Sequence, residues 1–492
     1  MRRLAIVLSL TAAGSMALPA PALVPAVPIP SQPGQDAEAF LGSPARARPV
    51  RTFHVPQHPF MAGNGRSNIH NDAYMTDAYR VPGPLGRGTE VTSTWLGIEE
   101  CASIGFDSKD RIIGLCGTID GARLRLMDAT SLETLNVLPL PPRQYRPGTT
   151  PLNDFCAAGY FYLDHQDRAV VSTNLNQVWV VAIEEAPTFS IERIVDLNQA
   201  VPPPDCLVSV LPDWSGRLWF VSKGGVVGTI DADTDAVQAL ALGEGVANSF
   251  AVDETGGVFI VSDHALYRFD AARGSGAPSV TWRVTYDRGS QVKPGMLSQG
   301  SGSSPTLVGR RLVAITDNAD PRMNVVVYRR GRSSGGAFVC REPVFGRNRS
   351  TTENSLIAVG RSLIVENNFG YENPLTTADG RSTAPGIARV DLDARRGRCR
   401  TAWTSREVSP TTVPKASSGS GLIYVYTKPP REDGVDAWYF TALDFRTGRT
   451  VFRRLTGTGY LYNNHYAPIS IGPDGAAYIG SLGGLIRIAD AR

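Results

Sequence analysis

The amino-acid sequence predicts an all-β protein, an eight-bladed β-propeller in which small antiparallel sheets close into a ring. Short alternating apolar runs recur in pairs on either side of a polar turn, as in residues 208–222 and 249–262, which is the pattern of β-hairpins. The chain holds 50 Gly and 35 Pro to supply such turns. No segment carries a sustained helical apolar period with capping residues.

The hairpins repeat along the chain at intervals of roughly 40 to 60 residues, which is the range of propeller blades. A third strand that ends in Asp often follows, such as residues 227–231 and 441–444, and a small-residue turn then leads into a fourth. Eight hairpin starts predict eight blades, with seven as the alternative if one repeat is misassigned. The starts fall near Cys101, Phe155, Cys206, Asn248, Ser303, Glu353, Pro414 and Tyr466.

A closed ring is expected because each four-stranded sheet has an apolar face that only a neighbouring sheet can cover. The last repeat offers three strands, near residues 467–471, 476–480 and 485–488. Residues 90–96 form a spare strand upstream of the first repeat. Pairing this N-terminal strand into the last blade would remove an exposed sheet edge and close the ring.

The chain before the repeats divides into three parts. Residues 1–22 have the pattern of a signal peptide, with Arg2 and Arg3 preceding a short apolar run, and predict a secreted or cell-envelope protein. Residues 23–50 are rich in Pro and Ala and predict a disordered linker. Residues 51–89 carry aromatic and polar side chains without a strand pattern, so we expect them to pack on the propeller, residues 90–492.

Charge and hydropathy limit the partners. The net charge is +3 and the charged residues are interspersed, so no basic stripe marks a nucleic-acid partner. The N-terminal apolar run is too short to span a bilayer, and no later segment is long and apolar enough, which predicts no transmembrane segment. Hydrophobic residues make up 42% of the chain, which is enough for one large core. We also expect the protein to be a monomer.

Six cysteines in an exported chain predict up to three structural disulfides, for which fifteen connectivities exist. Cys101 and Cys116 flank one predicted hairpin, so a cross-strand bond between them is plausible. Cys156 and Cys206 begin equivalent strands of neighbouring repeats, and Cys340 and Cys399 lie late in two others. No Cys or His spacing is that of a zinc site.

Four phrases of the sequence carry a resemblance to known proteins: residues 68–74 (NIHNDAY), 211–216 (LPDWSG), 314–321 (AITDNADP) and 365–371 (VENNFGY). Through them the chain from about residue 68 onward resembles a family of exported bacterial β-propeller proteins of unassigned function. The resemblance implies the fold and export, and it implies no particular activity.

Two more distant resemblances concern single blades. Residues 248–253 (NSFAVD) are similar to the Asn-Gly-Leu-Ala-x-Asp blade of gluconolactonase-like propellers, in which the Asn binds a metal, so the resemblance implies a metal ligand at Asn248. The eight-blade count and the Asp…Thr-Gly turn resemble quinoprotein-like propellers. This chain lacks that family's tryptophan-docking repeats and vicinal disulfide, which counts against quinone binding.

The first residues of the innermost strands should converge on the central channel. A metal site for Ca²⁺, which prefers oxygen ligands, would use Glu100, Asp154, Asn248 and Glu353. Such a cation could acidify a water, with His465 or Lys415 as catalytic acid or base. The alternative is a polar, water-filled channel whose groups hydrogen-bond one another.

Two polar clusters outside the innermost strands are candidate ligand-binding residues. The first is His70, Asn71 and Asp72, which would join a site if the N-terminal segment crosses the channel mouth. The second is Asn367, Asn368 and Tyr371, on a loop at one rim, where binding residues often lie. Ordinary turn and capping roles are the alternative for both clusters.

Two hypotheses for the function stay open. The first, which we favour, is a propeller that binds a small-molecule, carbohydrate or envelope ligand at the channel or rim. The second is a metal-assisted hydrolase or lyase, lactonase-like, that acts at the central channel. Because a fold does not decide function, the sequence leaves open whether the protein is an enzyme.

Overall fold

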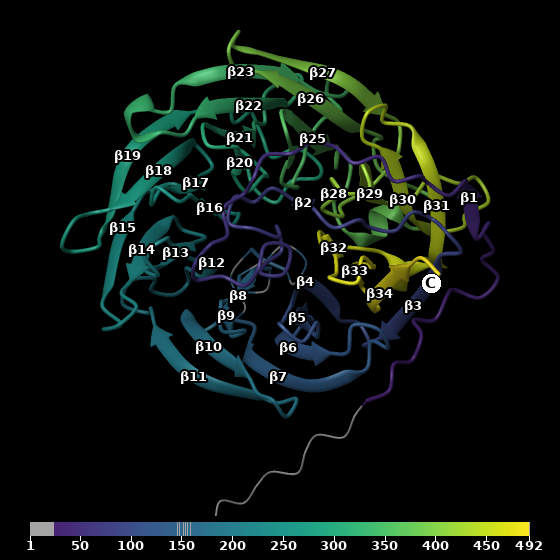
Figure 1. Ribbon diagram of the computed structural model, residues 1–492, viewed down its shortest axis with the longest axis horizontal. Coiled ribbons are helices and arrows are strands. Elements are labelled where there is room, and N and C mark those ends of the chain that lie inside the picture. The colour runs from purple at the N-terminus through teal and green to yellow at the C-terminus, as the bar shows by residue number, and fades with distance from the viewer. Residues whose placement is uncertain are drawn as a thin grey trace, which may run out of the picture.

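Eight antiparallel sheets stand around a central axis in the computed structural model, which describes residues 24–491 apart from 145, 147, 151, 153, 155 and 158 (Figure 1). The helices among these residues are three short 3-10 turns, η1 (Arg332–Ser334), η2 (Pro374–Thr377) and η3 (Tyr460–Tyr462). The predicted all-β, eight-bladed propeller is confirmed. The predicted signal peptide, residues 1–22, lies outside the described residues.

The first four blades follow one another along the chain, and each is given from its innermost strand outward. Blade 1 contains β4 (Glu100–Phe106), β5 (Ile112–Gly117), β6 (Gly121–Met127) and β7 (Thr134–Pro142). Blade 2 contains β8 (Phe161–Leu163), β9 (Ala169–Ser172), β10 (Gln177–Ile183) and β11 (Phe189–Asp196). Blade 3 contains β12 (Leu207–Pro212), β13 (Leu218–Ser222), β14 (Val226–Ile230) and β15 (Val237–Ala241). Blade 4 contains β16 (Ala251–Val252), β17 (Val258–Val261), β18 (Ala265–Ala271) and β19 (Pro278–Thr285).

The last four blades continue in the same sense around the ring. Blade 5 contains β20 (Thr306–Val308), β21 (Leu312–Thr316), β22 (Asn324–Arg329) and β23 (Phe338–Pro343). Blade 6 contains β24 (Ile357–Val359), β25 (Ser362–Glu366), β26 (Ile387–Asp393) and β27 (Arg398–Ser405). Blade 7 contains β28 (Lys415–Ser417), β29 (Leu422–Thr427), β30 (Ala437–Asp444) and β31 (Thr450–Thr458). Blade 8 contains β32 (Ile469–Ile471), β33 (Ala477–Ser481), β34 (Gly484–Ala489) and β3 (Glu90–Trp95).

Strand β3 closes the ring as the sequence predicts. It pairs antiparallel with β34 over its whole length, from Glu90 opposite Ala489 to Trp95 opposite Gly484. The outermost strand of blade 8 therefore comes from the other end of the chain, so opening the ring requires breaking a full ladder of hydrogen bonds.

A repeated turn explains why the hairpins of the first four blades could be predicted from the sequence. Asp107 follows β4, and its Oδ1 accepts hydrogen bonds from the backbone N–H groups of Lys109 at 3.0 Å and Arg111 at 2.8 Å. This Asx-type arrangement fixes the polar turn between two apolar strands. The same pair of bonds recurs at Asp164, Asp213 and Asp253.

Three disulfides use all six cysteines. Cys101 and Cys116 join β4 to β5 within blade 1, as proposed from the hairpin. Cys156–Cys206 joins the segments that precede blades 2 and 3, and Cys340–Cys399 joins the outermost strands of blades 5 and 6. Two of the three bonds therefore tie neighbouring blades together.

The segment before residue 51 differs from the predicted disordered linker. Strand β1 (Phe40–Gly42) pairs with β31 on the outer edge of blade 7, and the Ile29 side chain is only 3% exposed. A Cβ at Gly42 would lie 2.3 Å from the Val451 carbonyl oxygen, so only glycine permits this approach. The Pro-rich composition is typical of a linker, but the segment also contains a few apolar residues and a strand that covers the outer edge of blade 7.

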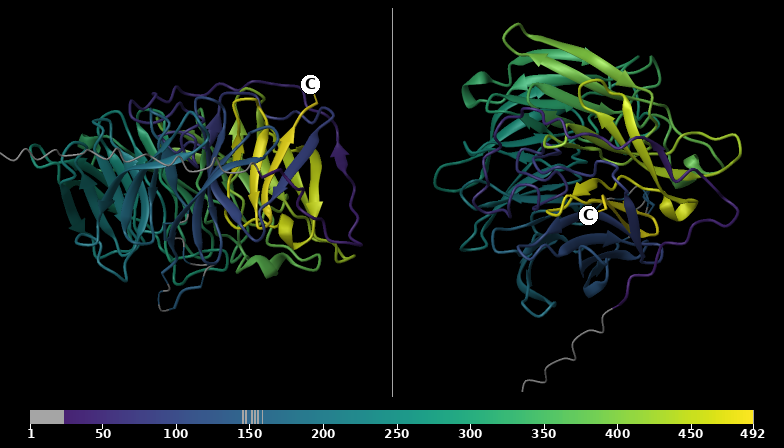
Figure 2. Two further views of the ribbon diagram at one scale, coloured as in Figure 1. Left: turned by 90° about the horizontal axis from the view of Figure 1, so that it is seen from below. Right: turned by 45° about the vertical axis from the view of Figure 1, so that its right-hand side comes forward.

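Residues 51–79, the cap segment, cross one face of the ring over the central channel (Figures 1 and 2). The segment ends in β2 (Ala78–Tyr79), which pairs parallel with β28, the innermost strand of blade 7. We call this side the cap face and the opposite side the loop face. The innermost strands begin at the loop face and end at the cap face, and the cap segment bonds to their last residue or to the residue before it.

Candidate functional site

The cap segment closes the channel with its backbone. Its carbonyl oxygens accept hydrogen bonds from amides of the innermost strands of six blades, which otherwise face the channel with no strand beside them. The six donor–acceptor pairs are Phe106–Arg66 (3.0 Å), Leu163–Ser67 (2.7 Å), Val252–Ala73 (3.0 Å), Leu307–Tyr74 (2.8 Å), Ala358–Thr76 (2.8 Å) and Ala416–Asp77 (3.0 Å).

Left-handed residues give the cap segment its curvature. Asn71, Met75 and Asp77 have φ of 62°, 56° and 54°, in a region that L-residues seldom adopt. The two carbonyls before Met75 accept hydrogen bonds from blades 4 and 5, and the two carbonyls after it accept from blades 6 and 7. The surrounding hydrogen bonds hold these unfavourable conformations in place.

Side chains anchor the cap segment at both of its ends. The Tyr74 hydroxyl donates to the Glu254 carboxylate and accepts from Arg330 at 2.9 Å, and the Arg330 guanidinium also stacks 4.6 Å from the Tyr74 ring centroid. At the other end His58 packs edge-on against Trp214, with ring centroids 4.1 Å apart. Burial lowers the pKa of His58 to about 4, so this imidazole is neutral at physiological pH.

Lys415, predicted as a catalytic group, is fully buried beneath the cap segment. Its ammonium pairs with Asp77 and donates to the Ile69 carbonyl at 2.7 Å, and His70 Nδ1 lies 3.1 Å from the same carboxylate. Burial raises the pKa of Asp77, but the charges and hydrogen bonds of His70 and Lys415 outweigh it and hold that pKa below its usual value. The geometry therefore places Lys415 and His70 where they fasten the cap segment.

His465, the second predicted catalytic group, lies at the loop face with both ring nitrogens engaged. Nδ1 is 2.8 Å from the Tyr371 hydroxyl and Nε2 is 2.7 Å from the Leu152 carbonyl oxygen. Because a carbonyl only accepts, Nε2 carries the proton and Nδ1 accepts from Tyr371. Burial lowers the pKa of His465, which keeps this neutral tautomer.

The three predicted carboxylate ligands, Glu100, Asp154 and Glu353, do not bring their oxygens within 4.8 Å of one another. Asp154 pairs with Arg146 at 3.0 Å, and Asn248 Oδ1 is 3.4 Å from the Tyr160 hydroxyl. Among the described residues, the one trio of His, Cys, Asp or Glu ligand atoms within 4.8 Å of one another is Asp154 with Cys156 and Cys206, whose sulfurs are joined in a disulfide. The positions of these residues in the sequence did not indicate how far apart their ligand atoms lie in the fold.

Glu100 and Glu353, the other two predicted ligands, are buried carboxyls. Glu100 Oε1 accepts from the His465 backbone N–H at 2.8 Å, and Glu353 Oε2 accepts from that of Leu297 at 3.1 Å. Burial raises the pKa of each to about 8. Without a cation beside them, both groups are therefore mainly protonated at neutral pH.

Asn367 and Asn368 hold the loops of blade 6. The Asn368 Oδ1 accepts from the Glu353 backbone N–H at 2.9 Å, and its Nδ2 donates to Glu366 and to the Pro410 carbonyl, each at 3.0 Å. Asn367 donates to two backbone carbonyls, both at 3.1 Å. Both amides are buried, and their hydrogen bonds join segments of this rim to one another.

Asn71 and Asp72 line a cavity of about 440 Å³ on the cap face, which we call the cap pocket. One wall is the chain from Thr52 to Gln57, and the other is Ile471 with the turn that follows it. The volume falls within the range of small-molecule sites. The cap pocket is therefore the place where predicted binding residues reach an open space.

One residue that lines the cap pocket, Asn71, carries a polar atom without a partner among the described residues. Asn71 Nδ2 donates to Asp72 Oδ2 at 3.3 Å and to the Ala78 carbonyl at 3.1 Å, which fixes the orientation of the amide. Its Oδ1 has no hydrogen-bond partner among the described residues, although the side chain is only 2% exposed. An unpaired buried acceptor costs about 1–3 kcal/mol, which a ligand that donates there would recover.

Asp72 holds the amide of Asn71 and the turn around it. Its Oδ1 accepts from the backbone N–H groups of Tyr74 at 3.0 Å and Thr76 at 3.2 Å, and its Oδ2 accepts from the Thr76 hydroxyl. Burial raises the pKa of Asp72 to about 7, so this carboxyl changes its charge near neutral pH.

The remaining polar lining of the cap pocket was not predicted from the sequence. Arg80, His54, Gln57 and Asn64 lie around it, and Arg80 is exposed. Arg66 also lines it, but its guanidinium pairs with Asp110. The density of polar residues between positions 54 and 80 was the available signal.

Comparisons with known proteins give little on function. No family model matches the chain. An uncharacterised protein from Archaeoglobus fulgidus is 28% identical over 318 residues, covering 58% of this chain and 61% of the relative. The chain thus spans about three fifths of that relative's length. The fold supports the propeller part of the sequence resemblance, and the particular family stays a prediction.

Solved structures that resemble this chain differ widely in sequence. BamB from Moraxella catarrhalis is 14% identical with a TM-score of 0.43, covering 66% of this chain and 80% of its own. A streptogramin B lyase structure is 10% identical with a TM-score of 0.41, covering 81% and 97%. A suggested 6-phosphogluconolactonase from Bacteroides fragilis is 11% identical with a TM-score of 0.38, covering 73% and 96%. Likenesses this low carry no argument about function.

Proposed function

We infer that this protein is a binding propeller whose cap pocket takes a small hydroxylated ligand bearing a carboxylate, of the uronate class. The buried Asn71 Oδ1, fixed toward one side by its own donated bonds and left without a partner, is the observation that supports this function. A ligand hydroxyl is the simplest donor for it.

The charges around the cap pocket favour an anionic ligand. Arg80 is exposed at the pocket, whereas the Arg66 charge is already compensated by Asp110. Guanidinium groups bind carboxylates through paired hydrogen bonds, and Arg80 is the group that would do so here. Apolar walls such as Phe53 and Ile471 would cover the carbon face of a sugar ring.

Isothermal titration with D-galacturonate and with neutral D-galactose tests this function. We expect galacturonate to bind at least tenfold more tightly than galactose, because only galacturonate offers a carboxylate to Arg80. Asn71→Gly should weaken galacturonate binding about fivefold, since glycine accepts the left-handed backbone and removes only the amide.

Two further variants complete the test. Arg80→Gln should remove the preference for galacturonate, and Arg87→Gln, a nearby exposed arginine outside the cap pocket, should leave it unchanged. Binding should also weaken from pH 6 to pH 8, because Asp72 ionises near pH 7 and adds a negative charge beside the ligand. Galacturonate affinity that is equal in the wild type, Asn71→Gly and Arg80→Gln would exclude the cap pocket as the site.

The proposed setting of this function is outside the cytoplasm. Three disulfides are consistent with folding in an oxidising compartment. No helix among the described residues is both long and apolar enough to cross a membrane. Cell fractionation of the full chain tests the setting, and recovery only from the cytoplasm would contradict it.

A further inference from the structure

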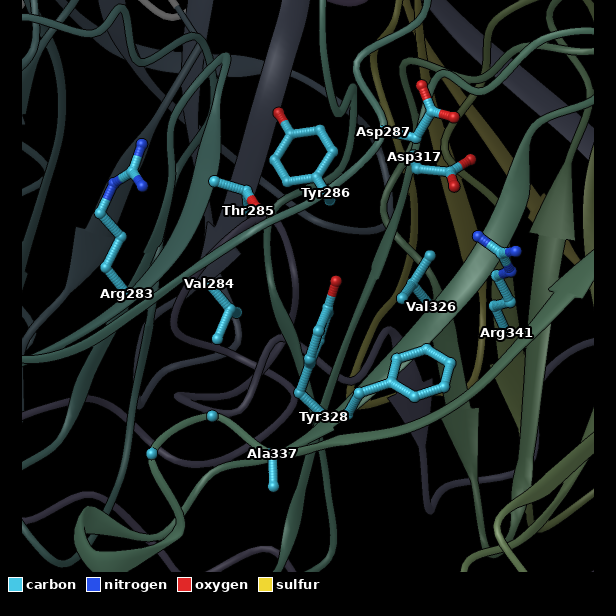
Figure 3. A pocket seen from close by; sticks show the side chains of 13 residues that line it. Arg283, Val284, Thr285, Tyr286, Asp287, Asp317, Val326, Tyr328, Ala337 and Arg341 are labelled. Carbon is cyan, nitrogen blue, oxygen red and sulfur yellow. The ribbon is translucent and has the colours of Figure 1, made fainter.

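A second open site lies at the outer strands of the propeller and is lined by residues between Arg283 and Arg341, none of which belongs to the cap segment. This inter-blade groove, about 700 Å³ in volume, lies between blades 4 and 5 (Figure 3). One side is the end of β19 with the residues that follow it, and the other is β22, β23 and the hairpin tip between them. Nothing in the proposed function uses this groove.

Tyr328 supplies a buried, unpartnered hydroxyl to the inter-blade groove. The residue is only 5% exposed, yet its hydroxyl forms no hydrogen bond within the described part of the chain. Figure 3 shows that hydroxyl directed into the space between Thr285 and Val326. The neighbouring Tyr286 differs, because its hydroxyl donates to the Ser262 carbonyl and accepts from the Ser301 N–H.

Phe338 supplies an exposed apolar surface beside that hydroxyl. Its side chain is 58% exposed, more than any other aromatic residue in the described chain, and its ring meets Tyr328 edge-on with centroids 6.2 Å apart. A phenylalanine left in water loses the free energy that burial would give. A ligand with an apolar face would cover this ring while hydrogen-bonding to the Tyr328 hydroxyl.

The charged groups around the groove include both signs. Asp317 is satisfied by Asn324, whose backbone N–H and Nδ2 donate to it at 2.6 and 2.7 Å, and Arg283 is paired with Glu244. Arg341 and Asp287 remain as one cation and one anion at the open side. With opposite charges and hydroxyl groups together, the lining suits a neutral ligand rich in hydroxyl groups.

The strand pairing at the floor of the groove favours a glycan over an extended peptide. A peptide that adds to a sheet needs an unpaired strand edge, but β22, which carries Val326 and Tyr328, is paired on both sides, with β21 and β23. The floor of the groove therefore offers side chains and no free backbone, whereas the outermost strands at its sides, β19 and β23, are each paired along one edge only. Recognition through a ring face and scattered hydroxyls is the mode that suits a sugar chain.

We propose that the inter-blade groove between blades 4 and 5 binds a neutral oligosaccharide, with Phe338 stacked against a sugar ring and the Tyr328 hydroxyl bonded to a sugar hydroxyl. The site is distinct from the cap pocket in position and in ligand charge. The protein would then hold a glycan on its outer wall and a small acid on its cap face.

Titration of the full chain with cellohexaose, maltohexaose and chitohexaose tests this proposal. We expect one of them to bind, with Phe338→Ala weakening it about tenfold and Tyr328→Phe about fivefold. Matched controls are Tyr460→Ala, which removes another exposed aromatic near blade 8, and Tyr439→Phe, which removes a blade 7 phenol without a hydrogen bond. Both controls should bind as the wild type does.

Three results would overturn the proposal. They are no binding of any of the three hexasaccharides, an affinity unchanged by both Phe338→Ala and Tyr328→Phe, or binding of a labelled Ser/Thr-rich decapeptide instead. Arg80→Gln and Asn71→Gly should not alter hexasaccharide binding, so failure at the cap pocket and failure at the inter-blade groove are separable. Equal thermal unfolding of the groove variants and the wild type checks that each variant is folded.

Discussion

The two ends of the central channel are closed by different kinds of hydrogen bond. At the cap face, backbone carbonyls of residues 66–77 accept from the ends of the innermost strands. At the loop face, side chains such as His465 and Tyr371 bond to each other and to loop backbone. Closure by backbone leaves cap side chains such as Asn71 available for a pocket, whereas closure by side chains uses up the polar groups themselves.

The largest expected effect comes from the ion pair that fastens the cap segment. Asp77→Ala should cost about 3–5 kcal/mol in the free energy of unfolding, because Lys415 would be left charged and buried without its counter-ion. The double variant Asp77→Ala/Lys415→Met should recover much of this loss. Denaturant midpoints measure both variants, and a loss under about 1 kcal/mol for Asp77→Ala would show that the pair does not hold the cap.

The buried carboxyls Glu100 and Glu353 should make the free energy of unfolding depend on pH. The pKa of Glu353 is raised by burial to about 8, so between pH 4.5 and pH 8 the folded chain holds a proton that the unfolded chain releases. Stability should therefore fall as pH rises through this window, by up to about 5 kcal/mol for this group.

Glu353→Gln checks the origin of this pH dependence. Because glutamine cannot ionise, the variant should lose less stability than the wild type between pH 5 and pH 8, and Glu100→Gln should behave in the same way. Thermal unfolding at both pH values measures the difference. Parallel curves for Glu353→Gln and the wild type would mean that Glu353 ionises normally in the folded protein.

Removing one bond at the loop face should have a smaller effect. Tyr371→Phe removes the hydroxyl that donates to the buried Nδ1 of His465 and should cost about 1–2 kcal/mol in unfolding free energy. Tyr439→Phe is the matched control and should be near neutral, because the Tyr439 hydroxyl makes no hydrogen bond to any residue that the structure describes. Equal costs for the two substitutions would argue that the side-chain closure contributes little.

The smallest effect on stability is expected at the cap pocket. Asn71→Gly loses two donated hydrogen bonds, but it also removes an unpaired acceptor and relieves a left-handed backbone. We expect a change within about 1 kcal/mol by denaturant unfolding. A loss comparable to that of Asp77→Ala would assign Asn71 to the scaffold and weaken its proposed binding role.

The ring could be predicted because its signals are local. Each hairpin, the spare strand at residues 90–96 and the Asp107-type turns are written in a few consecutive residues. The packing of residues 24–50 was missed because β1 depends on the distant edge of β31, and its Pro-rich neighbours are typical of linkers.

The site was harder to predict, because convergence on an axis does not give distances or partners. Lys415 stands at the start of β28 as the sequence suggested, but its ammonium forms an ion pair with Asp77, which is distant in the chain. Of the predicted metal ligands, Asp154 likewise has an arginine partner, Arg146, that the sequence did not indicate. Asn71 and Asp72 were singled out from the sequence as candidate binding residues, and only the fold shows which of their atoms lacks a partner among the described residues.

Hydrogen exchange of the innermost strands tests the closure of the cap face most directly. The amides of Leu307 and Ala358 should exchange as slowly as those of central strands such as β21, because Tyr74 and Thr76 carbonyls accept from them. Peptide-resolved mass spectrometry across residues 303–309 and 355–360 measures this protection. Exchange within seconds at these amides would mean that the cap segment does not close the channel, and the cap pocket would lose its floor.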